Sequence, residues 1–299
     1  MFNEFFNIGY ITSSLYGSYE KYSEKDFIFH DSKFIETGND ITHYIELYDP
    51  SNKKNIILLH GIMVNLNTWK QHLDLFSSSY NVFTIDFLGH GLSTKREISL
   101  KDIVDQIHLF IQAKNIKKPI IIGHSLGGLV ASIYASTYAC ELEKLIIISS
   151  IDYTHFNSDI LSKIGASLLD FVEPFLNSYT LPFIVNTITK KVYNNPSRFI
   201  GNFEDYLYHL KIKGFKKSII SLMKNHEYPG FNSLKYSNIK CPTLILHGDN
   251  DRLIFPDNAK ILEKNIPNSR LTMIKNGSHM IIDEFPFDFI SAANEFIES

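Results

Sequence analysis

The chain has 299 residues, of which 44% are hydrophobic and 20% are charged, with a net charge of −3. This composition is typical of a globular protein long enough for one large α/β domain, and it excludes a disordered or fibrous chain. The charge balance provides no concentrated basic face, so we expect no nucleic-acid partner.

The first residues and the cysteines bear on location. No Lys or Arg precedes Lys21, so the basic start of a signal peptide is missing. No apolar run reaches the roughly 18 residues of a membrane span, so we expect no transmembrane segment. Cys140 and Cys241 fit neither a disulfide framework nor a zinc motif. We therefore expect a cytoplasmic protein, and we leave open its oligomeric state and the role of residues 1–26.

Short apolar runs predict the strands. The runs at residues 27–34 and 43–48 predict two opening strands that can pair as a hairpin. Continuous runs then predict strands at 55–59, 82–85, 119–122, 145–149, 243–246 and 271–274. Runs without polar alternation are typical of strands that are covered on both faces, as in a parallel sheet.

Helical patterns lie between these strands. Residues 100–114 carry apolar side chains at a spacing of three or four, and further helices are predicted at 126–138, 256–265 and 285–297. The alternation of strands and helices predicts an α/β fold with a doubly wound, mostly parallel sheet.

The alternation stops between residues 151 and 238. This stretch is rich in Phe, Tyr and Leu, and it predicts helices at 161–175, 182–193, 202–210 and 215–224. It is too long for a plain loop. We therefore predict a core domain made of residues 1–150 and 239–299, with residues 151–238 inserted as a helical cap.

The strongest chemical signal is a G-x-S-x-G sequence, in which Gly123 and Gly127 flank Ser125. It follows an apolar strand and opens a helical pattern, which is the context that this motif needs. A sharp strand-to-helix turn exposes the serine oxygen, and glycines avoid collisions within that turn. The free N–H groups at the start of the helix point toward the carbonyl group that the serine oxygen would attack. Ser125 is therefore our candidate nucleophile.

With this motif and this order of elements, the chain resembles the α/β-hydrolase superfamily, in the branch with a helical cap. The resemblance extends from residue 27 to residue 296, and four further motifs carry it. The sequence Leu58-Leu59-His60-Gly61-Ile62 resembles the turn that supplies one oxyanion donor. The resemblance implies that the main-chain N–H groups of Ile62 and Leu126 stabilise the negative charge on the substrate oxygen.

The second motif is D-x-x-G-x-G-x-S from Asp86 to Ser93, to which we assign a structural role. In the third, a strand is followed by G-x-x-D, and its Gly248 spacing selects Asp251 as the acid of a catalytic triad, with Asp249 as the competitor. The fourth is Asn-Gly-Ser-His after the last strand, which ends on His279.

The chain has twelve histidines, and their positions in the predicted elements show which of them can be the general base. Only His279 lies in a loop after the last strand and downstream of a candidate acid, so it is the expected general base. The order Ser125, Asp251, His279 matches the order of the family. No histidine pair has the HExxH spacing, so we expect no metal site and no cofactor.

The resemblance implies a serine-dependent hydrolase that cleaves a small-molecule carboxylic ester through an acyl-enzyme. Epoxide hydrolases and haloalkane dehalogenases of this fold carry Asp at the position of Ser125, so we do not expect their mechanism. Alternatives within the fold are a C–C bond hydrolase, a thioesterase or an acylglycerol lipase, and an alternative from another class is a non-catalytic ligand receptor. Cap aromatics are candidate substrate-binding residues: Phe171, Phe175, Phe183 and Tyr206.

Overall fold

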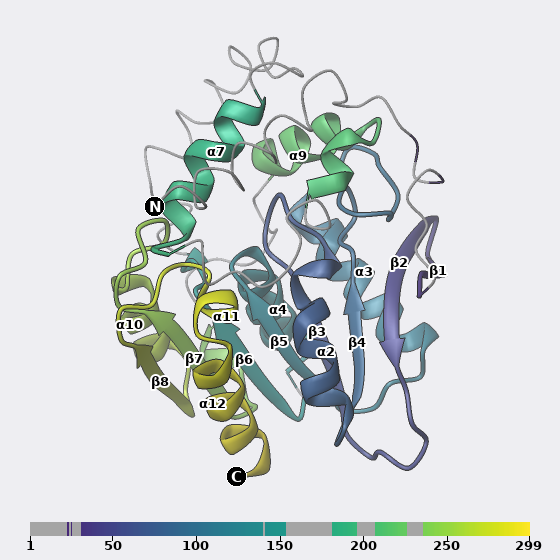
Figure 1. Cartoon of the computed structure of the whole chain (residues 1–299). Helices are drawn as coiled ribbons and strands as arrows, with labels where there is room; N and C mark the ends of the chain where they lie inside the picture. The colour runs from purple at the N-terminus through teal and green to yellow at the C-terminus, as the bar shows by residue number, and fades with distance from the viewer. Residues whose placement is uncertain are drawn as a thin grey trace.

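The computed structural model describes residues 31–139, 141–153, 181–195, 207–225 and 236–299, together with Ser23 and Lys25, and for residues 181–186 it describes the main chain only. Within these ranges an eight-stranded sheet runs through the molecule in the order β1-β2-β4-β3-β5-β6-β7-β8 (Figure 1). Its strands are β1 (Lys33–Thr37), β2 (Asp40–Leu47), β3 (Asn55–Leu59), β4 (Asn81–Ile85), β5 (Ile120–His124), β6 (Lys144–Ile148), β7 (Thr243–Gly248) and β8 (Ser269–Ile274).

The pairing confirms a mostly parallel, doubly wound sheet. β1 and β2 form an antiparallel hairpin, β2 pairs antiparallel with β4, and every pair from β4 through β8 is parallel. β3 lies between β4 and β5, so the connection from β3 to β4 runs toward β2, whereas the connection from β4 to β5 runs back past β3. Ligands in such sheets bind where the strand order reverses, at the carboxyl ends of the strands.

Helices cover both faces of the sheet. On one face lie α3 (Leu100–Ala113), α4 (Leu126–Thr137) and α10 (Asp257–Asn265), and on the other lie α2 (Lys70–Ser77) and α12 (Pro286–Glu298). In β3, Ile57 and Leu59 point into the first layer, whereas Ile56 and Leu58 point into the second. Every apolar side chain of this strand is therefore buried, which explains its unbroken hydrophobic run.

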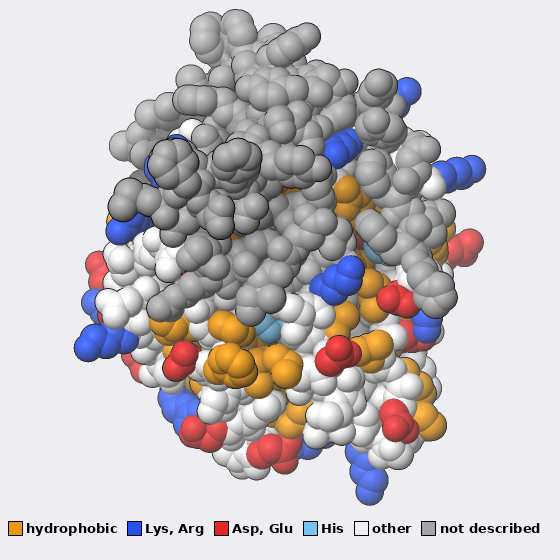
Figure 2. Space-filling view, in the orientation of Figure 1, with side chains coloured by type: hydrophobic (Ala, Val, Ile, Leu, Met, Phe, Trp, Pro, Cys, Tyr) orange, Lys and Arg blue, Asp and Glu red, His pale blue; other side chains and the backbone are white. Residues whose placement is uncertain are grey.

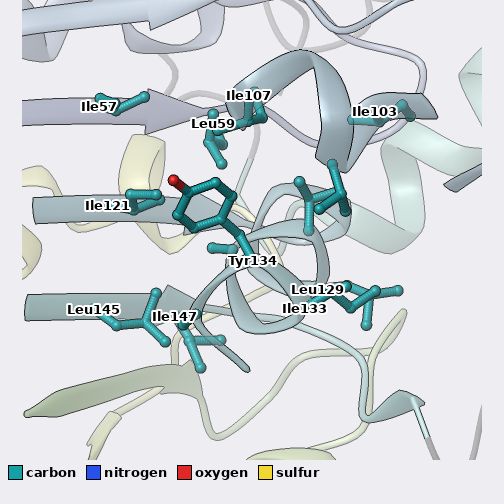
Figure 3. Packing of buried hydrophobic residues seen from close by; sticks show 14 of the residues in the cluster. Ile57, Leu59, Ile103, Ile107, Ile121, Leu129, Ile133, Tyr134, Leu145 and Ile147 are labelled. Atoms are coloured by element: carbon teal, nitrogen blue, oxygen red, sulfur yellow. The ribbon is translucent and has the colours of Figure 1, made fainter. Parts of the chain in front are cut away.

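The packing of α4 shows how firmly the first layer is held. Tyr134 of α4 lies among isoleucine and leucine side chains from three neighbouring strands (Figure 3). It is fully buried, and its hydroxyl donates to Glu141 Oε2 at 2.8 Å. The helix that begins directly after Ser125 is thus fixed to the sheet by close packing rather than by surface contacts.

The charged surface matches the modest net charge. On the face drawn in Figure 2, positive and negative side chains of the described residues are interspersed around a central group of hydrophobic ones. Within the described ranges, no helix is both long and apolar enough to span a bilayer.

Most predicted elements agree with the structure to within a residue or two. The largest difference is at the first strand: it was expected at 27–34, whereas β1 spans Lys33–Thr37 and residues 27–30 lie outside the described ranges. The hairpin turn sets this position, because Gly38 has a φ of +69° between β1 and β2. β1 is mostly exposed and only its last residue, Thr37, is buried, so the apolar pattern of the sequence gives a weak signal for its bounds.

The cap is described in parts. α7 (Leu181–Val192) and α9 (Phe215–Lys224) agree with two predicted helices, and a short 3₁₀ helix, η5, occupies Tyr208–Lys211. The helix predicted at 161–175 and most of that at 202–210 lie outside the described residues. The division into a core and an inserted cap stays a prediction.

Candidate active site

Ser125 occupies the turn between β5 and α4, with φ of 55° and ψ of −117°. A residue other than glycine in this conformation costs about 1–3 kcal/mol. The turn is held by the Ser125 N–H, which donates to the Ile148 carbonyl at 2.8 Å, and by Ser150 Oγ, which donates to the Ser125 carbonyl at 3.0 Å. The predicted strand-to-helix elbow is therefore present and strained.

The two flanking glycines are required by close backbone approach. A Cβ on Gly123 would lie 2.2 Å from the Gly127 carbonyl oxygen, and one on Gly127 would lie 2.3 Å from the Leu59 carbonyl oxygen. Both distances are far shorter than van der Waals contact. The motif is thus explained by packing between the elbow and the end of β3, which brings the Gly61 turn against Ser125.

Asp251 and His279 meet after β7 and β8. His279 Nδ1 donates to Asp251 Oδ2 at 2.8 Å, and both side chains are almost fully buried. Asp251 Oδ1 accepts the main-chain N–H groups of Leu253 and Ile254, each at 2.8 Å. Asp249 is instead an exposed turn residue. The structure therefore brings Asp251, and not its competitor, to the histidine.

The electrostatic state of Asp251 follows from its neighbours. Burial alone would raise its pKa, but hydrogen bonds from His247 and His279, together with their charges, outweigh burial and hold the pKa well below the usual range. His247 Nε2 donates to the Ile254 carbonyl at 2.8 Å and lies 3.4 Å from Asp251 Oδ2. The carboxylate is therefore ionised and held on both oxygens.

His124 holds the main chain of His279. Its Nε2 donates to the His279 carbonyl oxygen at 3.0 Å, and the two rings lie 4.9 Å apart between centroids. Burial and, as a smaller cause, the charge of His279 lower the pKa of His124 to about 3, so the ring is neutral near pH 7. The sequence motifs assigned no role to His124 or to His247.

His60 has a structural role in this site. Its Nδ1 donates to the neighbouring Gly61 carbonyl at 2.7 Å, and its Nε2 accepts the Phe87 N–H at 3.0 Å. Both ring nitrogens are used, and the ring is fully buried. His60 thus ties the end of β3 to the segment after β4 and leaves no nitrogen for chemistry.

Ser125 and His279 line one pocket of about 230 Å³. Gly61 and Ile62 lie at its edge, and the Leu126 N–H belongs to the first turn of α4, where main-chain donors lack partners within the helix. Apart from His124, Thr189, Tyr193 and the catalytic candidates, its described side chains are aliphatic or thioether groups: Ile62, Met63, Val64, Ile188, Val192, Leu207, Leu253 and Met280. The pocket is therefore suited to an uncharged, apolar group.

α7, which lies within the segment predicted as a cap, lines one side of this pocket with Ile188, Thr189 and Val192. The Met280 N–H, next to His279, donates to the Val192 carbonyl at 3.2 Å, and the Tyr193 hydroxyl donates to buried Asp283 at 2.5 Å. Asp283 also accepts from Gln71 at 2.6 Å. The end of α7 is therefore fixed to the loop that carries His279.

The predicted aromatic lining is only partly open to comparison. Phe171, Phe175 and Tyr206 lie outside the described residues, and Phe183 is on α7 with its side chain outside them. Helical periodicity can identify a buried face, but it does not tell which buried face meets a pocket. That is why the sequence did not select Ile188 and Thr189.

Comparisons with known proteins give three results. A family described as "alpha/beta hydrolase fold" matches residues 54–286. A protein of Mycoplasma pneumoniae whose name describes it as an esterase/lipase is 28% identical over 225 residues, covering 72% of this chain and 77% of that relative. Epoxide hydrolase 4 of Homo sapiens is 26% identical over 268 residues, covering 82% of this chain and 72% of the human protein.

Among solved structures, an esterase from Exiguobacterium antarcticum superposes with a TM-score of 0.72 at 17% identity, covering 89% of this chain and 99% of that one. At this identity the likeness concerns the fold alone.

Proposed function

The chain belongs to the alpha/beta hydrolase family, and we propose that it is a serine hydrolase that cleaves carboxylic esters by way of an acyl-enzyme. One observation carries the proposal: strained Ser125 lines the same pocket as His279, and His279 is hydrogen-bonded to ionised Asp251. These are the three groups that nucleophilic acyl transfer requires.

The proposed chemistry begins with the attack of Ser125 Oγ on the ester carbonyl carbon. His279 Nε2 takes the hydroxyl proton as the new C–O bond forms, and Asp251 stabilises the resulting imidazolium. When the tetrahedral intermediate collapses, His279 returns the proton to the leaving alkoxide, and the acyl group stays on Ser125. Water then attacks the acyl-enzyme with His279 as its base, and the carboxylic acid leaves.

Main-chain donors are proposed to stabilise the charge that develops on the carbonyl oxygen. The Leu126 N–H begins α4, whose positive end faces the pocket, and the Ile62 N–H belongs to the turn packed against Ser125. Removing one such donor typically costs about 10²–10³-fold in kcat.

The pocket supports an uncharged acyl group of short to medium length. Its volume of about 230 Å³ is below the roughly 300–1,000 Å³ of typical ligand sites. Asp, Glu, Lys and Arg are absent from its described lining. A carboxylate or an ammonium on the acyl chain would therefore lose its hydration without gaining an ionic partner.

Epoxide hydrolysis is not favoured, although one relative carries that name. Hydrolases of that type attack through a carboxylate, whereas the elbow of this chain presents a hydroxyl at residue 125. A serine adduct is the expected intermediate.

The proposal is tested with p-nitrophenyl esters of increasing acyl length. We expect Ser125→Ala to lower kcat by about 10⁴-fold or more and to abolish labelling by a fluorophosphonate. Ser132→Ala is the matched control, because Ser132 lies on α4 and its hydroxyl donates to the Gly128 carbonyl at 2.8 Å. Equal hydrolysis by wild type and Ser125→Ala would overturn the proposal.

A further inference from the structure

A cap segment touches the loop that carries the proposed oxyanion donor. This segment, residues 207–212, contains η5 and is largely buried. Leu207 lines the pocket, and two residues further on the fully buried ring of His209 reaches Asn65. One short stretch of the cap therefore contacts both the acyl pocket and the loop at residues 61–65.

The direction of the Asn65–His209 hydrogen bond is fixed by a second bond. Asn65 Oδ1 accepts the Asn67 N–H at 2.9 Å and thereby caps the helix η2 (Leu66–Trp69). The amide nitrogen is therefore on the other side, where Asn65 Nδ2 donates to His209 Nδ1 at 3.0 Å. His209 must accept at Nδ1, so it is neutral and carries its proton on Nε2.

The surroundings of His209 maintain this neutral state. Burial lowers its pKa well below the ordinary value, and the nearby His90 lowers it further, against the opposing charge of Asp86. Its Nε2 is buried and has no hydrogen-bonding partner among the described residues. The bond to Asn65 is the only side-chain hydrogen bond of His209 in the described ranges. A leucine at this position would fill the same space and leave no polar atom unsatisfied, so packing alone does not explain a histidine here.

Asn65 ends a loop whose other contacts are already fixed. At its start, the Gly61 carbonyl accepts from His60, and just beyond its end the Leu66 N–H donates to Asp86 Oδ1 at 2.8 Å. Between these points Met63 has a φ of +58°. Within the described residues, the Asn65–His209 bond links the end of this loop to segment 207–212.

We propose that His209 is a positioning residue, by which the cap fixes the loop at residues 61–65 and aims the Ile62 N–H at the substrate oxygen. This inference rests on the proposed function, because it requires that Ile62 acts as an oxyanion donor. His209 does not touch the substrate in this account. It acts through Asn65. Its loss therefore weakens the stabilisation of the transition state, but it does not change the volume of the pocket that receives the acyl chain.

The test compares two variants of His209 on esters of two lengths. His209→Leu removes the acceptor, and we expect kcat to fall about tenfold or more by the same factor for acetate and octanoate esters, with KM nearly unchanged. His209→Asn carries an amide oxygen on Cγ, where histidine has Nδ1, and we expect it to restore most of kcat.

Leu207→Ala is the matched control, because Leu207 belongs to the same cap segment but faces the pocket. We expect its effect to depend on acyl length and to act mainly through KM. Asn65→Ser removes the same hydrogen bond by changing its donor. Serine keeps an oxygen that can cap η2, but it lacks the amide N–H that donates to His209. We expect the same length-independent loss from Asn65→Ser, and no further loss when it is combined with His209→Leu.

The outcomes separate this inference from the proposed function. If wild type shows no Ser125-dependent ester hydrolysis, the proposed function fails. If wild type hydrolyses esters but His209→Leu and Asn65→Ser keep its kcat, only the role of His209 is overturned. A loss confined to the octanoate ester, or a loss that His209→Asn does not repair, would likewise overturn it. Should His209→Leu not fold, Asn65→Ser decides the question alone.

Discussion

Two buried histidine–aspartate pairs lie at the carboxyl ends of parallel strands in this molecule, and their local geometry is nearly the same. Asp251 follows β7 and binds His279 Nδ1 at 2.8 Å, whereas Asp86 follows β4 and binds His43 Nδ1 at 2.5 Å. Each carboxylate also accepts two main-chain N–H groups. In both, burial alone would raise the pKa, but the histidine bond and charge hold it well below the usual range.

The pairs differ in what the far ring nitrogen faces. His43 lies on β2, is fully buried, and its Nε2 is bonded to Ser32 Oγ at 2.9 Å. His279 instead lies on a loop and lines the pocket together with Ser125. Among the described residues, a serine therefore accompanies each of these two pairs: Ser32 is bonded to His43, and Ser125 lines the pocket with His279. The elbow, the helix start and the pocket distinguish the two sets, and the bond lengths do not.

The largest expected effect comes from Asp251→Asn. The amide would keep its oxygen toward Leu253 and Ile254 but would turn a donor toward His279, which then holds the wrong tautomer. We expect kcat to fall about 10⁴-fold with the far-UV circular dichroism unchanged. Asp249→Asn, at an exposed turn, should keep wild-type kcat. If Asp249→Asn abolished turnover and Asp251→Asn did not, the assignment of the acid would be wrong.

The sequence alone predicted those features of the fold and the candidate site that depend on local steric fit and on the order of residues along the chain. The glycines at residues 123 and 127 can only be explained by close backbone approach, and the apolar runs of the central strands reflect burial on both faces. The spacing from Gly248 favoured Asp251 over Asp249, and the structure pairs Asp251 with His279.

Other features could not be predicted because they depend on contacts between distant segments. Nothing near His43 in the sequence indicates a bond to Asp86, which lies 43 residues away. Likewise, His209 and Asn65 are separated by 144 residues, and their contact depends on how the cap docks. The pocket wall formed by α7 depends on the same docking, which the aromatic content of the sequence does not reveal.

The second-largest effect, on stability, should come from Asp86→Asn. Its amide would turn a donor toward the Leu92 N–H and toward His43, and so break a pair that is buried on both sides. Breaking such a pair costs about 3–5 kcal/mol of unfolding free energy, and we expect kcat at 25 °C to change less than about threefold. Urea unfolding and ester kinetics on the same preparation measure both. A large kcat loss with unchanged stability would reverse the roles assigned to the two pairs.

The pH dependence of this stability difference has a defined sign. Because the pKa of Asp86 is lower in the folded protein than its ordinary value of 3.8, the carboxylate stabilises the fold above that pH. Its contribution is lost as the pH falls further toward the folded pKa, whereas the amide of the variant does not titrate. The gap in unfolding free energy between wild type and Asp86→Asn should therefore be constant above about pH 5 and shrink below pH 3.8. A gap that widened in acid would contradict this account.

The smallest expected effect comes from Ser32→Ala, and it tests the contrast most directly. The variant removes one hydroxyl bonded to His43, which is worth about 0.5–1.5 kcal/mol of stability, and it should leave kcat and fluorophosphonate labelling unchanged. Ser32 starts an edge hairpin rather than a strained elbow, and the described residues that follow it form a strand and not a helix whose start could stabilise an oxyanion. Labelling of the Ser32 peptide in the Ser125→Ala protein would contradict this argument, since it would mean that the aligned serine, histidine and aspartate suffice without the elbow.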